Sequence, residues 1–178
     1  MTSKKHKNGT ERIAEIARKI KADLYVDIQG DEPLINPFHI DKLISFHLKN
    51  QEYEIVVPYI KFKSKKNDKN IVKIVSSKNK VIYFSRSDSP FFFKSKTKFF
   101  KKHLSIISFK RKSLLDFSQN KKTYLEKLES IELMRAIENN QSIGTFELKG
   151  KSFSVDVKKN YLHALKYMGN DEFFKKYK

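Results

Sequence analysis

A short apolar segment that runs directly into a carboxylate-bearing loop is the feature that most limits how this chain can fold. Residues 24–28, Leu-Tyr-Val-Asp-Ile, have the composition of a β-strand, and residues 29–33, Gln-Gly-Asp-Glu-Pro, follow at once. Proline cannot donate a backbone hydrogen bond, so Pro33 stops regular pairing just beyond the loop. In open α/β sheets ligands bind beyond the carboxyl ends of strands, where an aspartate can hold a divalent cation against nucleotide phosphates. We therefore predict an α/β sheet, with Asp31 as the first candidate metal ligand.

The spacing of apolar residues predicts that helices and strands alternate along the rest of the chain. Helices are expected over residues 11–21, 37–49, 125–139 and 160–168, with a short helix after residue 112. Further strands are expected over residues 55–60, 72–75, 81–85, 104–109, 143–148 and 152–155. Thr10 and Asn36 are the expected N-caps of the first two helices. The pattern is that of one α/β domain over residues 1–178.

The segment 125–139 is expected to form one continuous helix with a buried apolar stripe. The residues expected to point inward are Leu125, Leu128, Ile131, Met134 and Ile137. The charged residues expected on the other faces are Glu126, Glu129, Glu132 and Arg135.

Composition restricts the environment in which the chain works. With 178 residues, 39% of them hydrophobic, it can bury one core. It has no apolar run long enough to cross a bilayer, and its first residues lack the apolar block of a secretory signal. The absence of cysteine excludes disulfides and thiolate metal sites within the chain. We predict a cytoplasmic protein without a membrane partner.

The net charge of +18 raises nucleic-acid binding as a hypothesis, because clustered cations release counterions from a phosphate backbone. Only five of the 38 basic residues are arginine, the residue whose planar fork best recognises bases and phosphates. The lysines are also spread through the whole chain. The composition therefore favours a general bias toward lysine over a specific nucleic-acid site.

Two phenylalanine clusters leave two alternatives open. The clusters are Phe91–Phe93 and Phe99–Phe100, in a lysine-rich tract. Exposed aromatic clusters often cover an interface with a partner, whereas buried ones belong to the core.

Several motifs, taken in chain order, resemble one family, the CMP-Kdo synthetases or 3-deoxy-manno-octulosonate cytidylyltransferases, which attach CMP to an acidic eight-carbon sugar for lipopolysaccharide. Residues 1–12, which end in Asn-Gly-Thr-Glu-Arg, look like the family's nucleotide-contacting segment, and residues 26–33 look like its central motif. Further motifs at the family's spacing are Asn70–Lys73, Tyr83–Arg86 with Pro90, Lys102–Leu104, Leu125–Glu126, Ile131–Arg135 and Val155–Asp156. The resemblance covers nearly the whole chain.

This resemblance implies a Rossmann-like fold of the kind found in nucleotide-diphospho-sugar transferases, a GT-A-like mixed sheet with flanking helices. It implies that the anomeric hydroxyl of the sugar attacks the α-phosphorus of CTP while pyrophosphate leaves. Such a displacement needs charge neutralisation and alignment more than covalent chemistry. It also implies CTP and a Kdo-like acidic sugar as partners, a homodimer, and Mg²⁺ as the cofactor.

The same resemblance implies roles for individual residues. Asp31 and Asp156 would be catalytic and would hold Mg²⁺; the alternatives are a loop-capping Asp31 and an Asp156 that caps the last helix. The residues implied to bind the substrates are Gly9, Thr10 and Arg12 near cytosine and ribose, Gln29 near the sugar, and Arg86, His103 and Glu132 around the sugar acid. As alternatives, Thr10 would be a plain helix cap, His103 a satisfied core residue and Glu132 a solvated charge.

Departures from the family pattern leave the acceptor and the activity open. Residues 103–107, His-Leu-Ser-Ile-Ile, lack the family's usual tyrosine, and residues 131–135, Ile-Glu-Leu-Met-Arg, lack its usual amide. The family's triphosphate-binding strand and Ile-Pro-Ala-Arg loop have no counterpart among residues 1–178, so we expect a sheet without its first βα unit. Three hypotheses follow: a cytidylyltransferase completed by a separately encoded amino-terminal segment, a non-catalytic remnant or subunit of such an enzyme, and a basic nucleic-acid-binding protein. CMP activation of another acidic sugar stays open within the first.

Overall fold

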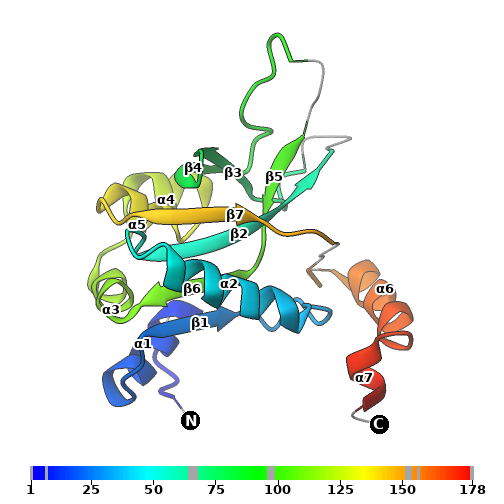
Figure 1. Cartoon of the computed structure of the whole chain (residues 1–178), viewed down its shortest axis with the longest axis horizontal. Coiled ribbons are helices and arrows are strands. Elements are labelled where there is room, and N and C mark those ends of the chain that lie inside the picture. Colours follow the sequence, from blue (N-terminus) through cyan, green and yellow to red (C-terminus); the bar gives the residue numbers. More distant parts are fainter. Residues whose placement is uncertain are drawn as a thin grey trace.

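A seven-stranded sheet with helices on both faces forms the body of the molecule (Figure 1). The computed structural model describes residues 2–6, 8–63, 68–95, 99–150, 154–155 and 157–176. The strands are β1 (Leu24–Ile28), β2 (Ile55–Phe62), β3 (Lys73–Ser77), β4 (Lys80–Ser85), β5 (Phe100–His103), β6 (Ile106–Lys110) and β7 (Ile143–Glu147). The helices are α1 (Gly9–Lys19), α2 (Pro37–Lys49), α3 (Arg111–Gln119), α4 (Tyr124–Glu129), α5 (Met134–Glu138), α6 (Lys158–Met168) and α7 (Glu172–Lys176).

The sheet is mixed, as the resemblance implies, and β2 lies at its centre. The strand order is β1-β6-β2-β5-β3-β4-β7. One edge of β2 pairs antiparallel with β6 and then β5, and the other edge pairs parallel with β7. Because β7 also meets β4 at Lys80 and Gly144, five strands close into a ring. Among the described residues β1 pairs only with β6, so β1 is the open edge of the sheet.

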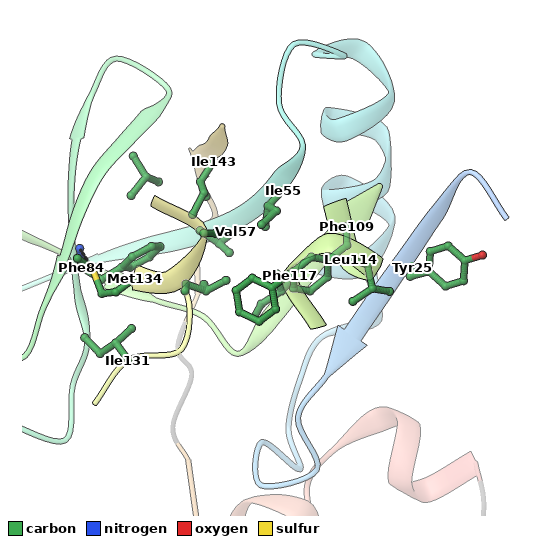
Figure 2. Close-up of a cluster of buried hydrophobic side chains, with 14 of the residues drawn as sticks. Tyr25, Ile55, Val57, Phe84, Phe109, Leu114, Phe117, Ile131, Met134 and Ile143 are labelled. Atoms are coloured by element: carbon green, nitrogen blue, oxygen red, sulfur yellow. Dashed lines mark hydrogen bonds between the residues drawn. The ribbon is translucent and has the colours of Figure 1, made fainter. Parts of the chain in front are cut away.

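Two apolar cores lie on the two faces of the sheet because successive strand residues point to opposite sides. Ile55 and Val57 join the larger core, which includes α1, α3 and the segment 131–136 (Figure 2). Val56 and Ile60 join the smaller core beneath α2. The site described below therefore stands on a sheet that is packed from both sides.

The predicted strand at 24–28, the helix over residues 37–49 with its Asn36 cap, and the β3–β4 hairpin are confirmed. Thr10 as the cap of the first helix is wrong. Asn8 caps α1, because its Oδ1 accepts a hydrogen bond of 2.8 Å from the amide of Glu11. Thr10 lies inside the helix and is buried, which leaves its hydroxyl available to another element.

The predicted continuous helix over residues 125–139 is wrong. The segment forms α4 and α5, separated by a turn in which Ser130 has φ 52° in the left-handed region. Glu126 and Arg135, expected on faces other than the buried stripe, are buried and paired, whereas Leu128, expected to point inward, is 63% exposed. In one helix, residues nine apart would lie about 180° from each other around the axis, so the break is needed for this pair to meet.

The predicted strand over residues 104–109 is β6, which covers Ile106–Lys110, and β5 before it was not predicted. The position of β5 answers part of the question about the phenylalanine clusters. Phe100 is buried on β5 against Phe62 and Phe92, so it belongs to the core. Phe91 and Phe93 are 84% and 82% exposed, in a segment that projects away from the sheet (Figure 1).

The carboxyl-terminal part differs in two ways from the predictions. The predicted strand at 152–155 falls largely outside the described residues, and residues 154–155 are not in a strand. The tail after α6 contains the short helix α7, in which Phe173 contacts Phe38 at the start of α2. Across the described ranges, no helix combines the length and the apolar character needed to cross a membrane.

Gly144, on strand β7, allows a test of how tightly the sheet packs against Tyr53. A Cβ atom at this position would lie 2.5 Å from Cδ2 and 2.6 Å from Cγ of Tyr53, closer than atoms in contact can come. We expect Gly144→Ala to lower the free energy of unfolding by about 1–3 kcal/mol, the usual cost of overpacking. Urea unfolding measures this change. Gly9→Ala is the control, since a Cβ there meets nothing within 4 Å; equal losses in both variants would contradict the packing.

Candidate functional site

Two adjoining pockets open where β1 ends. The first has a volume of about 440 Å³ and the second about 690 Å³. Gln29, Asp31 and Glu132 line both. The other predicted residues divide between them, with Arg86 and His103 in the first pocket and Gly9, Thr10 and Arg12 in the second. Eight of the nine predicted site residues are thus brought together, and Asp156 lies outside the described residues.

Backbone hydrogen bonds hold the loop 29–33 in place between the pockets. The amide of Gln29 donates to the carbonyl of Ser105 at 3.2 Å, and the amide of Ser105 donates to Oε1 of the buried Glu32 at 3.4 Å. On the other side, the amide of Val155 donates to the carbonyl of Asp31 at 2.8 Å. The loop is therefore joined to the turn before β6 and to the segment that leads toward α6.

Asp31 presents an exposed carboxylate at the boundary of the two pockets. Carboxylate oxygen is the donor that Mg²⁺ prefers, and proteins commonly bind this ion through one or two carboxylates, with substrate phosphates completing the shell. Within the described part of the chain, no group of three His, Cys, Asp or Glu side chains could hold a metal alone. The donor fits an ion shared with a nucleotide, and both Mg²⁺ and the role of Asp31 stay predictions.

Glu132 connects α1 to the turn between the short helices. Thr10 donates from Oγ1 to its Oε2 at 3.0 Å. Its other oxygen, Oε1, is buried without a hydrogen-bond partner among the described residues, and lies 4.0 Å from Nη2 of Arg135. Burial raises the pKa of Glu132, although the bond from Thr10 and the charge of Arg135 act in the opposite direction. Glu132 is thus not the fully solvated charge of the alternative hypothesis.

The buried pair of Arg135 and Glu126 supports Glu132 from below. Nε of Arg135 donates to Oε2 of Glu126 at 2.8 Å, and Nη2 donates to Oε1 at 2.6 Å. The guanidinium also lies 4.7 Å from the ring centre of Phe117. Burial alone would raise the pKa of Glu126, but the hydrogen bonds and charge of Arg135 outweigh it and lower the pKa. Glu126 therefore stays ionised beneath the site.

Arg86 lines the first pocket, but backbone carbonyls already use most of its guanidinium. Nε donates to Glu129 at 2.7 Å, Nη1 to Lys69 at 2.8 Å and Nη2 to Ser130 at 3.0 Å. A guanidinium has five donor hydrogens, so two remain for a ligand. Arg12 is also partly used, since its Nη1 donates to Oγ1 of Thr2 at 2.9 Å.

His103 closes the inner wall of the first pocket. Its Nε2 is buried and has no hydrogen-bond partner among the described residues, so it is not the satisfied core histidine of the alternative hypothesis. Burial lowers the pKa of His103 to about 4, and the charge of Glu32 opposes this only in part. The ring is therefore neutral at pH 7, with one nitrogen that can form a hydrogen bond to a ligand.

Other residues of the first pocket carried no recognisable role in the sequence. Asn70, Ser105 and Ser130 line it. A serine in a turn has no distinguishing pattern, and Ser130 was predicted inside a helix. For Asn70 the only indication was its place in a motif, Asn70–Lys73, that resembles the family.

Known proteins resemble this chain in sequence over most of its length. A family described as cytidylyltransferase matches residues 1–143. The chain is 37% identical over 172 residues to the 3-deoxy-manno-octulosonate cytidylyltransferase of Fusobacterium nucleatum, covering 94% of this chain and 70% of that protein. It is 35% identical over 171 residues to the enzyme of the same name from Geotalea daltonii, covering 88% of this chain and 68% of that protein.

A solved structure with a related name has the same fold. It is the structure of CMP:2-keto-3-deoxy-manno-octonic acid synthetase complexed with CTP, with a TM-score of 0.89 and 27% sequence identity. The superposition covers 96% of this chain and 71% of that chain.

The protonation state of His103 is open to a direct test. Because burial lowers its pKa to about 4, we expect its ring signals in an NMR titration to stay unchanged from pH 8 to about pH 5.5. The unfolded chain takes up this proton near pH 6.5, so stability from the buried neutral ring is complete above that pH and falls as the pH drops toward 4. His103→Gln should reduce this acid loss in urea unfolding. A titration midpoint near 6.5 would contradict the burial.

Proposed function

The chain belongs to the cytidylyltransferase family, among the 3-deoxy-manno-octulosonate cytidylyltransferases, and from this premise we propose that it transfers CMP from CTP to 3-deoxy-manno-octulosonate with release of pyrophosphate. One observation carries the proposal. Eight residues selected from sequence motifs line two adjoining pockets that share Gln29, Asp31 and Glu132. A reaction between two substrates needs such adjoining sites, so that the reacting atoms meet at their boundary.

The second pocket suits the nucleotide. Gly9 begins α1 at its wall, and the absence of a side chain there leaves open space beside the helix. Thr10 and Arg12 follow on the first turn. Arg12 has donor hydrogens beyond the one given to Thr2, which suits the carbonyl and hydroxyl groups of a cytidine.

The first pocket suits a polyhydroxylated acid. It offers Nε2 of His103 and Oε1 of Glu132, neither of which has a hydrogen-bond partner among the described residues, and the remaining hydrogens of Arg86. A buried acceptor without a hydrogen bond is costly, so a sugar hydroxyl that donates to Glu132 would remove that cost. The two hydrogens left on Arg86 suit a carboxylate.

In this proposal the side chains position the reacting groups and the metal neutralises charge. Asp31 and Asp156 would hold Mg²⁺, which when bound neutralises phosphate charge and lowers the pKa of a nearby hydroxyl. Gln29 would orient the sugar at the boundary. Glu132, held by Thr10, would keep the acceptor against the nucleotide. No covalent intermediate is needed for such a displacement.

The wall of the first pocket favours one variation on this function. Ser105 and Ile107 line it at the positions where the motif 103–107 departs from the family's usual pattern. CMP activation of another acidic sugar is therefore the second candidate.

With either acceptor we place the reaction in the cytoplasm, where CTP is made. If Kdo is the acceptor, the reaction is a step of lipopolysaccharide synthesis.

The open edge of β1 supports a further strand as a partner. Within the described ranges β1 pairs only through β6, so its other edge presents unpaired backbone groups. A strand that added there would end beside the loop 29–33. We propose that this strand carries the phosphate-binding loop, from a separately encoded segment or from the same polypeptide.

The projecting segment with Phe91 and Phe93 supports a homodimer. Both rings are more than four-fifths exposed, and no described element covers them. Aromatic rings in such a position usually contact a partner. A second copy of the chain is the partner that the resemblance implies.

The function is tested by measuring pyrophosphate release from CTP and Mg²⁺, with and without Kdo. The protein is used alone and joined to a segment that carries a phosphate-binding loop. We expect Kdo-dependent release, with Asp31→Asn abolishing it because the carboxylate at the boundary is lost. Asp41→Asn, at an exposed position on α2, is the control and should leave the rate unchanged.

The outcomes separate the hypotheses. Release only by the joined protein indicates a transferase completed by a further strand. Release with another acidic sugar but not with Kdo identifies the second candidate. No release in any arm contradicts the proposed activity and favours a non-catalytic remnant, and full activity of Asp31→Asn removes Asp31 from the metal site.

The dimer is tested by light scattering after size-exclusion chromatography. We expect the wild type to have the mass of two chains and the double variant Phe91→Ser, Phe93→Ser to have the mass of one, because two exposed rings are removed. Leu128→Ser is the control, since Leu128 is also exposed but lies on α4. A monomeric wild type would overturn the dimer.

A further inference from the structure

Lys73 is a fully buried lysine beneath the first pocket. It begins β3, between β4 and β5, and its side chain is 0% exposed. Taking an ammonium group out of water is costly unless the charge is paired and its hydrogens are bonded. The surroundings of Lys73 meet this requirement and show what the residue holds together.

The ammonium joins two segments that are apart in the sequence. Nζ donates to the carbonyl of Asp68 at 2.6 Å and to the carbonyl of Arg86 at 2.7 Å. The carboxylate of Asp88 lies 3.3 Å away and supplies the opposite charge. An ammonium has three donor hydrogens, and two of them are used in these bonds, one to each segment.

Both segments form the rim of the first pocket. The turn that follows Asp68 carries Asn70 and Val72 into the lining, and Arg86 is itself a lining residue. The amide of Asn70 donates to Oδ1 of Asp68 at 2.9 Å, so the position of Asp68 determines that of Asn70. Lys73 is not among the residues that line the pocket, and its effect on a ligand must pass through these neighbours.

A second cation crosses the same junction. The guanidinium of Arg86 donates to the carbonyl of Lys69 in the first segment and to the carbonyls of Glu129 and Ser130 at the end of α4. Lys73 holds the backbone of Arg86 while Arg86 holds the neighbouring turns. The orientation of the two guanidinium hydrogens left for a ligand therefore depends on Lys73.

We propose that Lys73 is a positioning residue for the acceptor sugar: it holds Asn70 and Arg86 at the rim of the first pocket and thereby determines the affinity for the acceptor. This proposal rests on the proposed function. It assigns Lys73 no contact with CTP, because its neighbours Asn70, Arg86 and Val72 line only the first pocket.

The test compares Lys73→Met with Lys101→Met in the complete active protein. Lys101 is a partly buried lysine of the neighbouring strand β5, whose Nζ donates to Oγ of Ser76 and lies over the ring of Tyr59, away from both pockets. Removing Lys73 takes the ammonium donor from the carbonyls of Asp68 and Arg86, of which that of Asp68 keeps the amide of Ile71 at 3.3 Å. We expect KM for the acceptor to rise about tenfold or more in Lys73→Met, with KM for CTP within about twofold of the wild type. Lys101→Met should change neither value.

Three results would overturn the proposal: an unchanged KM for the acceptor in Lys73→Met, an equal rise in KM for CTP, or the same rise in Lys101→Met. If Lys73→Met does not fold, Asp88→Asn replaces it, because this change removes only the opposite charge at 3.3 Å. An unchanged acceptor KM in Asp88→Asn would then count against the proposal, and a selective rise would support it.

Hydrogen exchange distinguishes this proposal from the proposed function. The amides of Asn70 and Arg86 donate to Asp68 and Glu129, respectively, and should exchange faster in Lys73→Met than in Lys101→Met. If the wild type shows no transfer to any acceptor, the proposed function fails, and faster exchange at these two amides still supports Lys73 as the positioning residue. Equal exchange in both variants would overturn it.

Discussion

The buried ion pair between Arg135 and Glu126 is the interaction on which the helical side of the site depends. It forms two short hydrogen bonds in a region that water does not reach. Removing one partner of such a pair leaves an uncompensated charge and costs several kcal/mol, about 3–5 by analogy with other proteins. The chain accommodates the pair by ending α4 at Glu129, with Ser130 as the C-cap, and starting α5 at Met134. That break places residues 130–133 at the first pocket, where Glu132 is shared with the second pocket.

The opposite side of the site depends on cations in another way. Lys73 and Arg86 donate to five backbone carbonyls in three separate segments, and neither relies on a side-chain partner for most of its hydrogen bonds. Every residue has a backbone carbonyl, so side chains in the connected turns can be substituted without removing these hydrogen bonds. The sheet, packed on both faces, then supplies the fixed base from which the turns extend.

Much of this arrangement could be predicted because local signals and tertiary structure agree. The strand 24–28 and the helix 37–49 carry strong patterns, and their bounds are confirmed. The failures occurred where a distant partner outweighed the local pattern. Leu128 fits a helical stripe but is exposed, because the pairing of Arg135 with Glu126 requires a break in the helix. Asn8 rather than Thr10 caps α1, and the hydroxyl of Thr10 donates to Glu132 instead. Motif resemblance selected pocket residues that no periodicity could identify, and it implied no role for Ser105 or Ser130.

The pairing of β2 with β7 has a consequence for how the protein reaches its folded state. Ile55 lies opposite Ile143, 143 − 55 = 88 residues later, and the same strand needs β5 and β6 on its other edge. The central strand thus cannot complete its ladders until most of the chain has left the ribosome. Non-local pairing of this kind slows folding because loop closure precedes any gain from contacts. Until β7 has been synthesised, one edge of β2 has no strand to pair with. During that interval the nascent chain can associate wrongly with other chains, and a chaperone would prevent this.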